Sequence, residues 1–111
     1  MPQFLVAIHH PDDYQPGLVE DDAMRHDIDV LNDDMVAAGV RKFVGGLKPV
    51  AQARSIPPGG GEVTEAPTMP GTLHMGGLWV LECADLDEAL AWGQRAAQAC
   101  RAPVEVRPFY P

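Results

Sequence analysis

The sequence predicts a single α+β domain in which two helices cover one face of an antiparallel sheet. Two segments with helical periodicity, residues 16–39 and 85–100, alternate with short apolar segments of strand character. A chain of 111 residues has room for one domain, residues 1–111, and buries roughly two-thirds of its unfolded surface without disulfides or metals. With 46% hydrophobic and 22% charged residues, the composition is that of a globular protein and excludes a disordered chain.

The first strand is expected at residues 3–9, with apolar side chains on both faces. One face carries Phe4, Val6 and Ile8, and the other carries Leu5 and Ala7. Neither face is therefore suited to water. The strand ends in HHPDD, residues 9–13, whose residue types can bind metals. Because adjacent strand residues point to opposite faces and Pro11 stiffens the turn, we interpret this segment as a polar strand end.

The first helix is expected to begin near Glu20 or Asp21, where acidic residues suit the positive end of the helix dipole, and to stop at Gly39. Its apolar stripe comprises Met24, Ile28, Leu31, Met35 and Ala38. A second stripe, offset by half a turn, comprises Asp22, His26, Asp29 and Asp33. A His among carboxylates suits a proton relay or a metal pair, but on a solvent face these groups are simply hydrated. We therefore expect His26 to be exposed and dispensable.

The centre of the chain is expected to form strands and a hairpin tip. Residues 41–44 predict the second strand, and Gly45 and Gly46 predict a bulge or a close backbone approach. Residues 47–56 predict a continuation or a third strand, interrupted at Pro49. Residues 57–61, PPGGG, predict the tip. A glycine triplet also suits phosphate binding, but no helix N-terminus follows to complete such a site.

The most apolar strand is expected at residues 77–83, directly after a pair of glycines. Upstream of it, Pro67, Pro70 and Gly71 prevent a regular ladder. Residues 65–74 are therefore expected to form a loop of fixed shape.

The second helix and the last strand complete the chain. Asp85 predicts an N-cap and Glu88 completes a capping box. The inner face of the helix is expected to comprise Leu86, Leu90, Gly93, Ala97 and Cys100. Because small residues dominate this helix, it can approach a sheet closely. Trp92 lies off that face and needs cover from a loop or a second subunit. In the last strand, Val104 and Val106 alternate with Glu105, Arg107 and Phe109.

Charge and cysteine usage exclude several classes of partner. A formal charge of −8 argues against binding to nucleic acid or to an anionic membrane, because both need a basic face. The N-terminal segment lacks a signal peptide, and no run approaches the roughly 18 apolar residues that span a bilayer, so we expect a cytoplasmic protein. Cys83 and Cys100 flank a helix that separates them by about 24 Å, too far for a disulfide. We interpret both as small buried apolar groups, and we expect no metal and no cofactor.

The order strand, helix, strand or hairpin, strand, helix, strand predicts a ferredoxin-like split βαβ arrangement with both helices on one face of the sheet. The other face then stays uncovered. Since the first and the most apolar strands are apolar on both sides, a symmetric second copy is the simplest cover. We therefore expect a homodimer.

Residues 63–68, VTEAPT, followed by Gly76 and Gly77, are similar to a signature of the DGPF-containing branch of the YCII-related proteins. That pattern runs V-T-D-G-P-F, seven linking residues, then G-G and two aromatics. Of the four named residues only Pro67 is kept, since Glu65, Ala66 and Thr68 replace the other three. The resemblance extends to residues 3–8, 37–40, 46–47, 85–90 and 104–108. It implies a dimeric α+β barrel with a pocket between sheet and loops.

Two functions from different classes follow. One is a small-molecule-binding or regulatory homodimer, which suits the resemblance, since DGPF-branch proteins are often encoded beside extracytoplasmic-function sigma factors. The alternative is a small cofactor-free enzyme with isomerase-like or oxygenase-like acid/base chemistry. The changes at Ala66 and Thr68 favour binding over catalysis, because they alter the signature itself.

The ligand site is expected where residues 65–74 meet the end strands. Glu65, His74 and Arg107 would supply its polar groups, and Trp79 an apolar wall. His74 titrates near neutral pH, and Arg107 presents a planar fork to a carboxylate. The competing interpretation is a structural Glu65–Arg107 pair that fixes the loop to the sheet and leaves His74 exposed.

Overall fold

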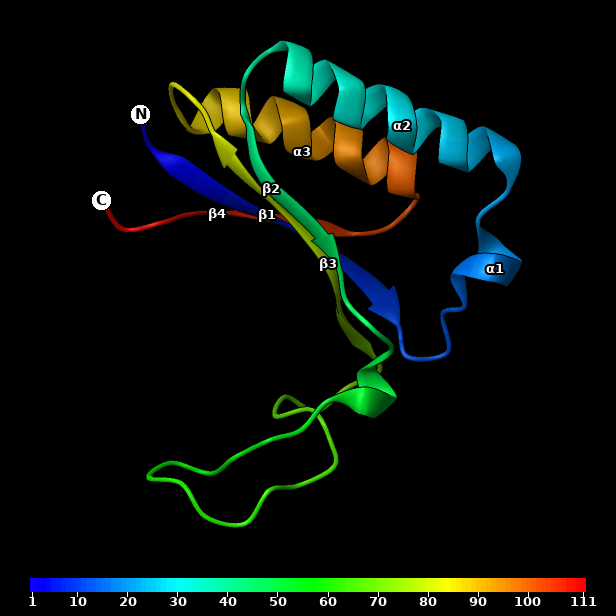
Figure 1. The fold of residues 1–111 in the computed structure, drawn as a ribbon, viewed down its shortest axis with the longest axis vertical. Coiled ribbons are helices and arrows are strands. Elements are labelled where there is room, and N and C mark those ends of the chain that lie inside the picture. The colour runs from blue at the N-terminus through cyan, green and yellow to red at the C-terminus, as the bar shows by residue number, and fades with distance from the viewer.

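In the computed structural model, which describes residues 1–111, four strands form one open antiparallel sheet in the order β2-β3-β1-β4. The strands are β1 (Gln3–Pro11), β2 (Arg41–Gly46), β3 (Leu73–Glu82) and β4 (Val104–Pro108). The helices are α1 (Pro16–Val19), α2 (Asp22–Ala37) and α3 (Leu86–Cys100), and a 3-10 turn spans Val50–Gln52. This topology agrees with the predicted ferredoxin-like α+β class. Figure 1 shows α2 and α3 side by side along the sheet.

The first long helix forms for the reasons that the sequence indicates. Asp21 is its N-cap, and its carboxylate accepts a 2.8 Å hydrogen bond from the Met24 backbone N–H. Met24, Leu31 and Met35 are buried. His26 is exposed, as predicted, whereas the expected core residue Ala38 is also exposed because it follows the end of the helix.

The small-residue face of α3 lets this helix lie close to the sheet. Asp85 caps it, accepting from the Glu88 N–H, and the Glu88 carboxylate accepts in turn from the Ala84 N–H. The buried residues are Ala89, Gly93, Ala96, Ala99 and Cys100. The expected inner positions Leu86 and Leu90 are wrong: both are exposed. A face of Ala and Gly packs more closely than a face that includes Leu.

The core lies between the sheet and the two long helices. Alternate residues of β1 and β3 meet helical side chains in one buried cluster, which includes Phe4, Val6, Trp79, Leu81, Leu31 and Met35. Their neighbours along the strands, such as Leu5 and Val80, point to the opposite face. One sheet face is therefore packed and the other has no helix over it.

A bulge in β3 changes which residues share the packed face. Ile8 pairs with Gly77 but His10 pairs with His74, so β3 has one extra residue at Gly76. The two glycines therefore lie inside the strand, and His74 belongs to it rather than to the expected loop. At Gly45 and Gly46 the structure has the close backbone approach rather than the bulge, since a Cβ on Gly77 would lie 3.3 Å from the Gly45 carbonyl. The irregularity of β2 lies between Arg41 and Phe43.

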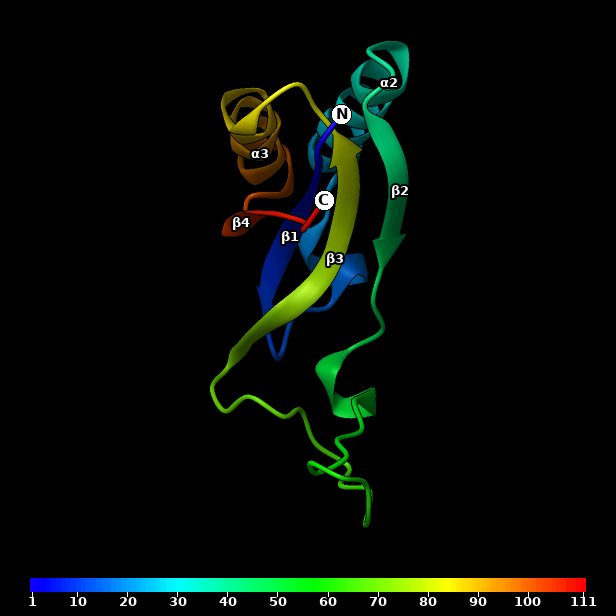
Figure 2. The same cartoon turned by 90° about the vertical axis from the view of Figure 1, so that its left-hand side faces the viewer.

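Residues 47–72 leave the sheet as a long arm (Figure 2). The strand predicted at residues 47–56 is wrong: the segment has a 3-10 turn, and its only β-pairing with the other limb of the arm is the isolated Ser55–Thr64 bridge. Pro49 cannot donate to a ladder, which ends β-pairing early. The tip at residues 57–61 forms a turn, as predicted, with the Gly60 N–H donating to the Pro57 carbonyl. The radius of gyration is 15.3 Å, above the roughly 13 Å usual for this length.

The close approach of α3 to β4 yields a prediction. A Cβ on Gly93 would lie 2.6 Å from Cγ2 of Val106, so Gly93→Ala should destabilise the fold by up to about 2 kcal/mol. The expected clash costs about 1–3 kcal/mol and outweighs a gain of about 1 kcal/mol in helix propensity. Urea denaturation measures the change.

A double-mutant cycle with Val106→Ala isolates this contact. The double variant should be less destabilised than the sum of the single variants by at least about 1 kcal/mol. Additive effects would show that the helix and the strand do not collide there.

Candidate functional site

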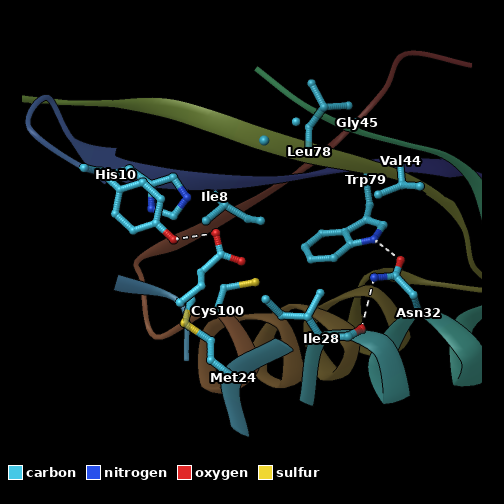
Figure 3. Close-up of a pocket in the computed structure, with 14 residues that line it drawn as sticks. Ile8, His10, Met24, Ile28, Asn32, Val44, Gly45, Leu78, Trp79 and Cys100 are labelled. Atoms are coloured by element: carbon cyan, nitrogen blue, oxygen red, sulfur yellow. Dashed lines mark hydrogen bonds between the residues drawn. The ribbon is translucent and has the colours of Figure 1, made fainter. Parts of the chain in front are cut away.

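A cleft of 180 Å³ lies between the packed sheet face, α2 and the segment that contains α1 (Figure 3). Apolar side chains supply most of its wall, with polar groups at the two ends. Its lining comprises Ile8, His10, Tyr14, Glu20, Met24, Ile28, Asn32, Val44, Gly45, Gly46, Gly77, Leu78, Trp79 and Cys100. Apolar walls with a few convergent polar groups are typical of small-molecule sites.

One end of the cleft is formed by His10, Tyr14 and Glu20. The His10 and Tyr14 rings stack with centroids 3.7 Å apart and planes within 1° of parallel. The Tyr14 hydroxyl donates a 3.2 Å hydrogen bond to Oε2 of Glu20. Burial, together with the Glu20 carboxylate, raises the pKa of Tyr14 to about 12. Tyr14 therefore remains a neutral donor whose hydrogen is already in use.

His10 keeps its polar atoms free within this end. Neither ring nitrogen has a hydrogen-bond partner in the protein, and neither is sealed off from solvent. Desolvation by burial lowers the pKa of His10, and His9 lowers it further, against the opposing effect of Glu20. The imidazole is thus neutral at neutral pH and offers one lone pair as a hydrogen-bond acceptor.

The other end of the cleft is closed by a hydrogen-bonded network around Asn32. Its Oδ1 accepts from Trp79 Nε1 at 2.9 Å and from Arg41 Nη1 at 3.1 Å, while its Nδ2 donates to the Ile28 carbonyl at 3.0 Å. Trp79 is 2% exposed, so this network fixes the indole as a rigid wall. The expected role of Trp79 as an apolar wall therefore has a geometric basis here, but not beside the residues predicted to join it.

The thiol in the cleft is not an activated nucleophile. Burial raises the pKa of Cys100 to about 11, with Glu20 adding to the effect. The thiol stays protonated near neutral pH. Burial also raises the pKa of Cys83 to about 11, and both cysteines are free, as the sequence predicts.

His74, the second predicted site residue, bridges the arm and the loop after β1. Its Nδ1 lies 2.6 Å from Oδ1 of Asp12, and its Nε2 lies 2.9 Å from the Met69 carbonyl. The side chain is 13% exposed, so the interpretation of His74 as merely exposed is wrong. We call the contacts among His74, Asp12 and Met69 the histidine clamp.

The structure does not bring the four predicted residues into one site. Arg107 pairs with Leu5, which pairs with Val80, whereas His74 lies six residues before Val80 along β3. The two are therefore about 20 Å apart. Arg107 also lies on the uncovered face, and Glu65 lies exposed on the arm. No ion pair joins Glu65 to Arg107, so the competing prediction of a structural pair between these two residues is also wrong.

Sequence reasoning missed most of the cleft because its parts come from distant segments. His10 stood in a segment interpreted as a polar strand end, and its face depends on the bulge in β3. Tyr14 and Glu20 flank α1, a single helical turn too short to show periodicity. Asn32 was not singled out either, although a polar residue beside the apolar stripe of α2 is a local signal that could have identified it.

Other site classes find no support in the geometry. No three His, Cys, Asp or Glu side chains gather where they could hold a metal ion. Among the helices, none combines the length and the apolar character needed to cross a membrane.

Comparison of the chain with models of known protein families and with curated proteins gives no match. The fold and the cleft define a small ferredoxin-like α+β protein with an apolar cleft that has hydrogen-bond acceptors at one end.

The histidine clamp yields a pH-dependent prediction. A neutral imidazole donates from one nitrogen only, whereas both nitrogens of His74 face oxygen atoms. The Met69 carbonyl and then Asp12 raise the pKa of His74 above its usual value of 6.5. The clamp therefore contributes stability that is complete below pH 6.5 and is lost as pH rises through the folded-state pKa.

The measurement is the difference in melting temperature between the wild type and His74→Gln. The gap should be larger at about pH 5.5 than at about pH 9. His26→Gln, at an exposed position without partners, is the matched control and should show little gap at either pH. A gap that grows with pH would contradict a protonated clamp.

Proposed function

We propose that this protein is a cytoplasmic small-molecule-binding or regulatory homodimer whose ligand occupies the cleft lined by His10, Glu20 and Trp79. The observation that carries the proposal is the unpartnered, neutral His10 imidazole at one end of an apolar cleft. A half-buried polar group without a protein partner is a place where a ligand can add a hydrogen bond. The resemblance to the DGPF branch of the YCII-related proteins supports the same class.

The uncovered sheet face supports the dimer. Across three strands, Phe43, Val80 and Leu5 form one cross-strand row that ends at Arg107 on β4. Phe43 is 57% exposed, and its ring lies over Gly45. An apolar row of this kind is a candidate protein interface. A symmetric second copy on it would close the two sheets into the dimeric α+β barrel that the resemblance implies.

A second candidate function is a cofactor-free acid/base enzyme in the same cleft. Its support is the neutral His10 imidazole, a suitable general base, beside the Tyr14–Glu20 pair. Turnover of a bound compound, lost in His10→Gln but retained in His9→Gln, would favour this candidate over a binding protein.

The ligand proposal predicts that filling the cleft abolishes binding. Small apolar and amphipathic compounds are screened by thermal shift, since a ligand of the native state raises the melting temperature. For any hit, Ile28→Phe should weaken binding at least tenfold, about 1.4 kcal/mol. Val36→Phe, on the exposed side of the same helix, should leave it unchanged. Equal loss in both variants would place the ligand elsewhere.

The dimer proposal predicts a charge-sensitive sheet face. Light scattering should show a dimer at micromolar concentration, and Phe43→Glu should raise the dissociation constant at least tenfold, because it buries a charge in an apolar interface. Leu90→Glu, on the exposed side of α3, should leave the dimer intact. A monomeric wild type would refute the proposal.

A further inference from the structure

We propose that the cleft selects a small primary amine, bound as its ammonium form, in preference to neutral or anionic compounds of the same shape. The inference rests on the proposed ligand-binding function of this cleft and names the chemical class of the ligand. It follows from which hydrogen-bonding groups at the two ends of the cleft are already satisfied.

The end formed by His10, Tyr14 and Glu20 presents acceptors to a ligand. Glu20 receives one hydrogen bond, at Oε2 from Tyr14, and Oε1 has no donor. His10 adds a lone pair from its neutral ring. The Tyr14 hydrogen is used within the pair, so the only donor left is one imidazole N–H. An ammonium group, with three donors and no acceptor, matches such an end.

The charges around the cleft favour a cation. Glu20 is the only carboxylate in the lining, and no Lys or Arg side chain lines the cleft. The guanidinium groups near the cleft already have partners in the protein. Arg25 donates to the carboxylate of Asp22 and the backbone carbonyl of Glu20, and Arg41 donates to Oδ1 of Asn32. Arg101, next to Cys100, donates to the Asp27 carboxylate and the Ala99 carbonyl. The formal charge of −8 on the whole chain also favours a cationic ligand.

The far end and the walls limit the rest of the ligand. Asn32 uses both lone-pair directions of Oδ1 and one Nδ2 hydrogen within the protein, so recognition is concentrated at the His10 end. A volume of 180 Å³ slightly exceeds the roughly 150 Å³ cavity that holds benzene. The body of the ligand should therefore be apolar and about the size of one six-membered ring with one further carbon.

Benzylamine, benzyl alcohol and benzoate test this inference as probes of nearly equal shape. Binding is followed at about pH 7 by the NMR shift of the Trp79 indole N–H. Benzylamine should bind at least tenfold more tightly than benzyl alcohol, and benzoate should bind most weakly. In Glu20→Gln the preference for the amine should fall below about threefold, while benzyl alcohol still binds and so reports an intact cleft. Glu62→Gln, which removes an exposed arm carboxylate, is the matched control for net charge.

The possible results separate the inference from the proposed function. If benzylamine and benzyl alcohol bind equally, or if benzoate binds best, the amine inference is wrong while the cleft remains a binding site. If benzylamine loses no affinity in Glu20→Gln, the named acceptor is wrong and the inference falls. If none of the three probes shifts the Trp79 signal and the wider screen gives no hit sensitive to Ile28→Phe, the proposed function fails as well.

Discussion

The His10 ring occupies the space that a side chain at residue 76 would need. A Cβ on Gly76 would lie 2.3 Å from Cδ2 of His10, a separation that no ordinary side chain tolerates. Glycine at this position lets β3 carry its extra residue and lets the ring lie flat against the strand, where Tyr14 stacks on it. The neighbouring Gly77 serves a related purpose, since a Cβ there would lie 3.3 Å from the Gly45 carbonyl. A side chain at residue 76 would therefore displace His10 from the polar end of the cleft.

Predictions from the sequence succeed where the determining contacts are local. The helix start near Asp21, the cap at Asp85 and the alternation of Phe4, Val6 and Ile8 depend on residues a few positions apart, and all of them lie as expected. The amino-acid pattern fails where a distant segment decides the outcome. Leu86 and Leu90 have helical spacing, but the branched valines of β4 select the smaller face of α3 instead. The sequence pattern of the helix alone does not show which of its faces packs against β4.

The predictions for the candidate site also failed where contacts between distant segments decide the structure. His74 and Arg107 each stood next to a recognisable motif, yet antiparallel register sends them to opposite ends of the sheet. The register depends on one bulged residue, because each single-residue shift reverses the face of every following side chain. His10 and His74 therefore share the packed side. Tyr14 and Glu20 reach it through a single turn of helix that no periodicity could reveal.

The arm and the cleft are mechanically connected through the segment after β1. Asp12 binds His74 through its side chain, and its backbone N–H donates to the Thr72 carbonyl at 2.8 Å. Two residues later, Tyr14 stacks on His10. A change in the protonation of His74 therefore acts on the same short segment that positions the acceptor end of the cleft. β3 links the cleft to the uncovered face in a similar way, because Trp79 forms a cleft wall while the adjacent Val80 lies in the apolar row. In the proposed dimer, a ligand packed against the indole would lie one peptide unit from the interface, and any coupling between binding and association would act equally in both directions.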